Sequence, residues 1–186
     1  DRLLSRGLGD VYKRQRLSIM ITDNIGIDTL EAPLLLFAQA DLLAYQNKND
    51  EALAMLDSLK RSFPTHTISD DIYYKRYQIN YSQRKYEQAA SNLQSIINDY
   101  SDDILADDAI YNLAVMNEEK FDDQTKAASL YRRLMFDYQG SIYVVDSRKR
   151  YRAIESEVRV INVEEDNLII GTFSGDGDSK LYNDKK

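Results

Sequence analysis

The chain has 186 residues, 43% hydrophobic and 30% charged, which is typical of a soluble globular fold with enough apolar residues for a core. Its 24 basic and 31 acidic residues give a net charge of -7, which argues against nucleic acid or an anionic membrane as a general partner. The sequence contains no cysteine, which excludes disulfides, thiolate zinc sites and cysteine nucleophiles. The longest apolar run, residues 32–40, is too short for a membrane span, which needs roughly 20 residues.

The first residues stand apart from the rest. Residues 1–15, DRLLSRGLGDVYKRQ, resemble the translation of sequencing-adapter DNA, which predicts a non-native leader. Residues 16–32 are then expected to be the remnant of a preceding segment. The alternative is a native, basic, amphipathic lead-in.

A helical stripe recurs three times in the middle of the chain. Each stripe steps by four, three and four residues, which places its members on one side of an α-helix. The stripes are Ala52, Leu56, Leu59 and Phe63; Ala89, Leu93, Ile96 and Tyr100; and Ala127, Tyr131, Leu134 and Tyr138. Their alanines are 37 and 38 residues apart, which indicates an internal repeat.

A partner helix precedes each stripe, because Phe37, Tyr74 and Tyr111 are also spaced by 37 residues. The sequence therefore predicts three helix pairs, over residues 33–46 and 49–62, 70–83 and 86–99, and 106–119 and 124–137. The links inside each pair are short, so the two helices must run antiparallel.

The boundaries of the pairs have recognisable chemistry. Pro64 cannot continue a helix. Two acidic pairs, Asp70–Asp71 and Asp107–Asp108, are expected at the start of the following helices, where carboxylates interact favourably with the positive end of the helix dipole.

Residues 141–154 are predicted to form a terminal capping helix, with Ile142, Val145, Tyr151 and Ile154 on its apolar face and Arg148, Lys149, Arg150 and Arg152 on its polar face. An irregular or mobile tail is expected over residues 155–186.

Residues 33–154 resemble the tetratricopeptide repeat family. The family's small residue early in the second helix corresponds to Ala52, Ala89 and Ala127, and its closing proline to Pro64. The resemblance implies an all-α, right-handed α-α solenoid of about three helix pairs (33–64, 70–101 and 106–139) with the cap at 141–154. Tyr77 departs from the pattern, because it stands where Ala40 and Ala114 provide the small residue of the first helix. The long repeats are similar to those of bacterial cell-envelope proteins, which favours the periplasm or cell envelope over the cytoplasm.

The resemblance also implies a binding surface. In that family the first helix of each pair lines a concave groove that holds a peptide or helix of a partner. The expected groove residues here are Phe37, Asp41, Tyr74, Gln78, Tyr81, Tyr111 and Val115, with Arg148 and Lys149 as a local basic patch. The competing interpretation is that the aromatic residues of this set pack in the core, as aromatic stripes at helical spacing usually do.

Nothing in the sequence indicates catalysis, a cofactor or a metal. His66 is the single histidine, and without a cysteine or an acid at ligand spacing it is expected to be a solvated loop residue. Adjacent acids such as Asp122 and Asp123 diverge by about 100° on a helix and cannot converge on one substrate.

The main functional hypothesis is a non-enzymatic scaffold that binds a protein partner in the groove. The alternative is the positioning or regulatory arm of an enzyme whose catalytic domain lies upstream. Binding of nucleic acid by the terminal basic helix is a third and weaker hypothesis, given the net charge of -7. Self-association is also expected if the first repeat has lost its neighbour.

Overall fold

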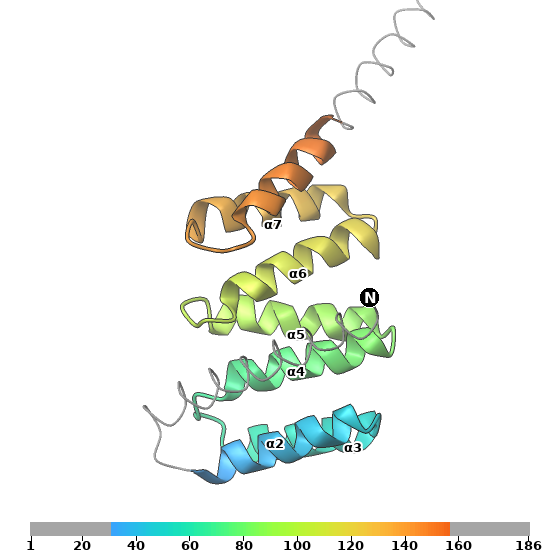
Figure 1. Cartoon of the computed structure of the whole chain (residues 1–186), viewed down its shortest axis with the longest axis vertical. Coiled ribbons are helices and arrows are strands. Elements are labelled where there is room, and N and C mark those ends of the chain that lie inside the picture. Colours follow the sequence, from blue (N-terminus) through green and yellow to red (C-terminus); the bar gives the residue numbers. More distant parts are fainter. Residues whose placement is uncertain (1–30, 157–186) are drawn as a thin grey trace, which may run out of the picture.

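The computed structural model describes residues 31–156, and in this range all regular secondary structure is helical. Six helices form three consecutive pairs, α2 (Glu31–Tyr45) with α3 (Asn49–Ser62), α4 (Ser69–Ser82) with α5 (Tyr86–Asp99), and α6 (Ala106–Glu119) with α7 (Gln124–Asp137). Residues 144–156 form one more helix, the terminal helix. The pairs stack one on the next, and the terminal helix covers the last pair (Figure 1). The described chain is thus an all-α solenoid of helix pairs.

The observed helix bounds agree closely with the repeat pattern. Predicted helices 49–62, 86–99, 106–119 and 124–137 coincide with α3, α5, α6 and α7. Helix α2 begins two residues before the predicted start at Pro33. Proline is tolerated there because the backbone N–H groups of the first turn have no hydrogen-bond partner within the helix, so the missing N–H of Pro33 costs nothing. The predictions for residues 1–30 and 157–186 lie outside the described residues.

The alanine-headed stripes form the centre of the core. Nine of their residues are at most 1% exposed: Ala52, Leu56, Leu59, Ala89, Leu93, Ile96, Ala127, Tyr131 and Leu134. The aromatic residue that closes each stripe is half-buried and packs against the same core. Each second helix packs with this stripe against the first helix of its own pair. Burial of the repeated stripe therefore holds each pair together.

Helix α4 connects two halves of the core. Ile72 and Ile79 belong to a cluster that includes α2 and α3, whereas Tyr74 and Tyr77 belong to a second cluster that continues to Ile154 of the terminal helix. The departure from the family pattern at Tyr77 is accommodated, because its buried ring lies 5.4 Å from the ring of Tyr74 in an edge-on arrangement. Helix α4 is thus buried on two sides and joins the first pair to the rest of the stack.

Each helix pair turns through a residue in the left-handed conformation. These residues are Asn47, Arg84 and Asp122, with φ of 61°, 60° and 54°. They occupy the same place in each repeat, five residues before the stripe alanine and two or three residues after the last residue of the first helix. In the first two turns the following amide donates back to the helix, from Lys48 N to Leu43 O and from Lys85 N to Asn80 O, each at 2.9 Å. The sequence predicted the short links but not this shared geometry.

The predicted apolar face of the terminal helix is partly wrong. Ile142 and Val145 are 81% and 78% exposed, while Ser147 and Ile154 are buried against the stack. Residues 142–143 form a turn, and the helix begins only at residue 144. Ile142 therefore lies outside the helix, and the buried face is set by the i, i+4 and i+7 positions of Ser147, Tyr151 and Ile154.

The stripe packing makes a direct prediction about stability. Leu93→Ala is expected to lower the free energy of unfolding by about 2–5 kcal/mol, because it leaves a cavity at a fully buried position. Ser91→Ala, at an exposed position of the same helix, is the control and should change stability by less than about 0.5 kcal/mol. Urea unfolding followed by circular dichroism measures both, and equal midpoints for the two variants would contradict the packing.

The left-handed turns make a second prediction. Arg84→Gly is expected to raise the free energy of unfolding by about 1 kcal/mol, because glycine adopts a φ of 60° without the steric cost of a Cβ atom. Arg84→Ala removes the same side chain but keeps Cβ, so it should give no gain. Thermal unfolding distinguishes the two variants, and a similar gain from alanine would assign the effect to the arginine side chain instead.

Candidate functional site

The first helices of successive pairs are linked by polar side chains along one surface. Each link joins residues 34 or 35 positions apart, which is close to one repeat. The links run from Lys75 Nζ to Asp41 Oδ1 at 2.5 Å, from Tyr77 OH to Asn112 Oδ1 at 3.1 Å, and from Tyr111 OH to Asp146 Oδ2 at 2.6 Å. They connect α2 to α4, α4 to α6, and α6 to the terminal helix. This ladder of polar contacts fixes the spacing of the first helices at the surface.

The ladder ends in a network around Arg150. Its guanidinium donates from Nε to Asp146 Oδ2 at 2.9 Å and from Nη1 to Glu118 Oε2 at 3.0 Å. The hydroxyl of Tyr131 donates to the same Glu118 oxygen at 2.5 Å. Glu119 Oε1 also lies 3.4 Å from Nη1 of Arg150. Three elements, α6, α7 and the terminal helix, therefore meet at one cation and three carboxylates.

The network changes the acid–base properties of its tyrosines. Burial, and then the hydrogen bond to a carboxylate, raises the pKa of both Tyr111 and Tyr131 above the ordinary value of about 10. The hydrogen bond from Tyr111 is the main cause that lowers the pKa of Asp146 below its ordinary value. At neutral pH the phenols are thus neutral donors and Asp146 is ionised, so the network is stable in that charge state.

The aromatic members of the predicted groove lie largely within the fold. Phe37 and Tyr74 are buried members of the two core clusters. Tyr111 is half-buried and its ring stacks on that of Tyr143, with centroids 4.2 Å apart and planes at 11°. Tyr81 is half-buried, and its ring lies 5.5 Å from that of Tyr86. These side chains contribute mainly to packing, which leaves a smaller set open to solvent.

The accessible members form a row. Asp41, Gln78 and Val115 are 37 residues apart and occupy the same position in the first helix of each pair. Gln78 is exposed, and Asp41 and Val115 are half-buried. Asp41 already pairs with Lys75, with 42% of its side-chain surface still accessible. The row presents an acid, an amide and an aliphatic side chain in succession.

The basic cluster of the terminal helix divides into two parts. Arg148 and Lys149 are exposed and form no ion pair with any residue in the range 31–156. Arg150 points to the stack and holds the network described above. The i, i+4 spacing of Asp146 and Arg150 is the sequence signal for this role. No sequence pattern predicts the hydrogen bond from Arg150 to Glu118, because it depends on how the terminal helix packs on α6.

The prediction for His66 is wrong. The side chain is 4% exposed, and its Nδ1 accepts a hydrogen bond from Ile68 N at 3.1 Å. It shapes the turn that leads into α4. Nearby, Lys60 Nζ donates to Ser69 Oγ at 2.7 Å and to Tyr100 OH at 3.0 Å, and thereby ties the first pair to the second. The polar side chains of His66, Lys60 and Ser69 therefore stabilise the contact between the first and second helix pairs.

The described residues offer neither a cluster of metal ligands nor a membrane-spanning helix. In residues 31–156 no group of three or more histidine, aspartate or glutamate side chains has an arrangement that could hold a metal ion. None of the described helices is both long enough and apolar enough to cross a membrane.

The raised pKa of Tyr131 predicts a pH dependence of stability. Because its pKa is higher in the folded state than in the unfolded state, the contribution of its neutral phenol is complete below pH 10 and is lost as the pH rises above 10. Tyr131→Phe is expected to lose about 1–2 kcal/mol at neutral pH, since Glu118 loses a donor. Above about pH 10 its stability should fall less steeply than that of the unmodified chain. Urea unfolding over this pH range measures both, and parallel curves would contradict the assignment.

Comparison with known proteins bears on the first helix pair. The sequence profile of the tetratricopeptide repeat family matches residues 35–66, which cover most of α2 and all of α3. No curated protein matches the chain. Helix pairs α4–α5 and α6–α7 continue the architecture of the matched pair. The chain is therefore similar, through its first pair, to a repeat that generally serves as a non-catalytic scaffold for protein contacts.

Proposed function

We propose that this chain is a protein-interaction scaffold that binds an extended or helical segment of a partner protein along the A-helix face. The A-helix face is the accessible surface of the first helix of each pair, with Asp41, Gln78 and Val115 as its central residues and the half-buried Tyr81 beside them. Arg148 and Lys149 extend it at the terminal helix. The observation that carries the proposal is the row of one accessible side chain per repeat at a constant spacing of 37 residues.

The chemistry of the row suits recognition of a specific segment. A helix position that only has to face solvent accepts any polar side chain. A partner segment that lies across several repeats, however, meets an acid, an amide and an aliphatic side chain one after the other. The half-buried ring of Tyr81 adds contact area, and tyrosine is enriched at interfaces because it combines an apolar body with a polar tip. A segment that matches this order gains specificity at each repeat.

The polar ladder supports the same proposal through rigidity. The contacts from Lys75 to Asp41 and from Tyr111 to Asp146 hold neighbouring first helices at fixed distances. A surface that is already ordered loses less conformational entropy when a partner binds. The similarity of residues 35–66 to the tetratricopeptide repeat adds independent support for a binding role.

Selection from a displayed random-peptide library tests the proposal. Peptides selected on the full chain should bind a Gln78→Arg, Val115→Arg variant at least tenfold more weakly, since both changes place bulky cations on the A-helix face. The control is Ser58→Arg, Ser91→Arg, which adds the same charges at exposed positions of α3 and α5. Equal losses in both variants, or failure to select any peptide, would contradict binding at the A-helix face.

A further inference from the structure

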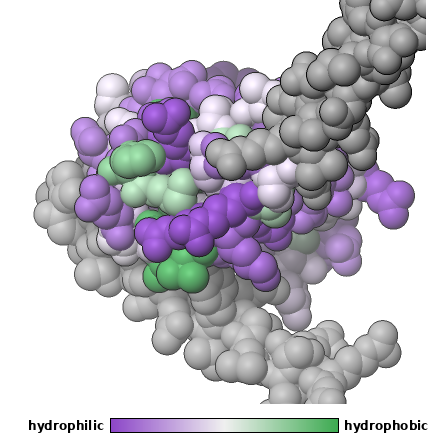
Figure 2. Space-filling model, turned by 90° about the horizontal axis from the view of Figure 1, so that it is seen from above, coloured by the Kyte–Doolittle hydropathy of each residue, from purple (hydrophilic) through white to green (hydrophobic). Residues whose placement is uncertain are grey.

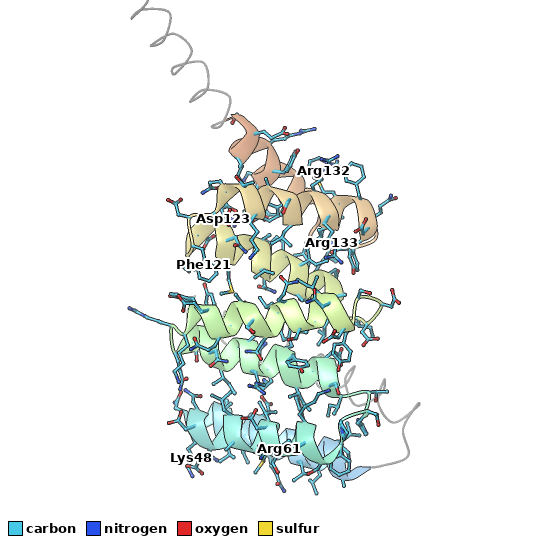
Figure 3. All side chains as sticks on the ribbon, turned by 180° about the vertical axis from the view of Figure 1, so that it is seen from behind. Lys48, Arg61, Phe121, Asp123, Arg132 and Arg133 are labelled. Carbon is cyan, nitrogen blue, oxygen red and sulfur yellow. The ribbon has the colours of Figure 1, made fainter. Side chains whose placement is uncertain are left out.

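A groove of about 430 Å³ lies between the outer side of α7 and the terminal helix. Arg132, Arg133 and Phe136 of α7 line it together with Tyr151 of the terminal helix. Phe136 is 64% exposed, and the guanidinium carbon of Arg132 lies 5.8 Å from the centre of its ring. Figure 3 labels both arginines on α7, and Figure 2, which views the terminal-helix end, shows hydrophobic side chains at the surface among hydrophilic ones.

The repeat itself shows that these residues are not required by the fold. Helices α3, α5 and α7 perform the same packing task with the same alanine-headed stripe. Counted from the stripe alanine, the positions of Arg132, Arg133 and Phe136 hold Gln94, Ser95 and Asn98 in α5 and Asp57, Ser58 and Arg61 in α3. An exposed aromatic ring beside two arginines therefore occurs in the last of the three helices and not in the other two.

Tyr151 is the terminal-helix residue that lines the groove, and further cations lie on the same helix within one turn of it in sequence. In α6, Ile110, Ala114 and Asn117 are buried, in the pair that α6 forms with α7. Thirty-eight residues later, the terminal helix has Arg148, Arg152 and Glu155 at these positions, and all three are exposed. The side of the terminal helix on which a further helix would pack is thus polar and mainly basic.

The charges around the groove are not balanced. Arg133 lies 3.6 Å from Asp137, and Glu155 accepts a hydrogen bond from the hydroxyl of Tyr151 at 2.6 Å. Arg132, Arg148 and Arg152 form no ion pair with any residue that the structure describes. Arg132 beside the exposed ring of Phe136, together with two guanidinium groups without an ion pair on the terminal helix, contrasts with the net charge of -7 of the whole chain. Such a local field attracts carboxylates rather than another copy of the same basic surface.

We infer that this groove is a second docking surface and that it takes an acidic, amphipathic segment of a partner protein. Apolar side chains of the segment cover Phe136 and Tyr151, while its carboxylates pair with Arg132, Arg148 and Arg152. Guanidinium groups suit this task because they bind carboxylates through two parallel hydrogen bonds. The lining of the groove belongs to α7 and the terminal helix, and Arg148 is the residue that this surface shares with the A-helix face. The variants that test the inference leave Arg148 unchanged, so their outcome does not depend on the A-helix face.

Fluorescence anisotropy with a designed probe tests the inference on the full chain. The probe is a labelled helical peptide of about 15 residues with leucine and glutamate along one stripe. The informative variant is Arg132→Gln, Arg133→Ser, Phe136→Asn, which gives α7 the residues that α5 has at the same positions. All three side chains lie on the groove side rather than in the stripe, so thermal unfolding should be unchanged. The affinity for the probe should fall roughly tenfold or more.

Matched controls distinguish docking in the groove from general attraction between opposite charges. The variant Lys48→Gln, Arg61→Gln removes the same net charge at exposed positions of the first helix pair, away from the groove, and should bind the probe within about twofold of the unmodified chain. A probe with serine in place of leucine should bind much more weakly, and higher salt should weaken binding of the original probe. The inference is overturned if the serine probe binds equally well, or if the triple variant retains its affinity.

Two other occupants would also overturn the inference. Tighter binding of a short DNA duplex than of the peptide, lost in the triple variant, would assign the arginines to nucleic acid. A dimer in sedimentation experiments that becomes a monomer in the triple variant would show that a second copy of this chain fills the groove. A monomeric chain with no measurable affinity for DNA is the expected result.

Discussion

Burial of the alanine-headed stripe is the constraint on which the rest of this structure depends. Ala52, Ala89 and Ala127 are completely buried, so each second helix lies close to its partner and each pair has the same internal geometry. Pairs built in the same way then stack one on the next, which brings side chains about 35 residues apart into contact. The polar ladder from Asp41 to Asp146 is a consequence of that stacking, because the same side of every first helix meets the next pair.

Tyrosine side chains connect successive elements of the stack through hydrogen bonds. The chain has 14 tyrosines and no tryptophan, and several place a ring in the core while the hydroxyl reaches a carboxylate or amide of the next element. Tyr131 and Tyr111 do so beside Arg150, and each of their hydroxyls adds a hydrogen bond to a carboxylate that Arg150 already pairs, Glu118 and Asp146 respectively. The end of the solenoid is thus held both by the apolar packing of Ile154 and by a network in which each charge has an opposite charge or a donor.

The parts of the structure that followed from the sequence are those governed by local periodicity. Four helices coincide with their predicted ranges, because a stripe such as Ala89, Leu93 and Ile96 specifies both the helix and its buried side. Burial of His66 and the bond from Arg150 to Glu118 depend on the packing of separate elements, which no local pattern specifies. The exposure of Ile142 has the same origin, since the start of the terminal helix is set by the turn that precedes it. For the candidate surface, the sequence left open whether Tyr74 packs in the core or faces a groove, and the structure buries Tyr74 while Gln78 is exposed. Burial of that ring depends on the neighbouring pair, which no local pattern specifies.

The differences between repeats carry the functional information in this chain. Where the fold makes the same demand three times, the residues are alike, as at the three stripe alanines. Where it makes no demand, each repeat is free to differ, as Arg61, Asn98 and Phe136 do at exposed positions of the second helices. An exposed aromatic ring such as Phe136 costs solubility and adds nothing to the packing of its own helix. Its presence in one repeat and absence from the others therefore points to a contact outside the repeat, and the same reasoning applies to the changing row of Asp41, Gln78 and Val115 on the opposite helices.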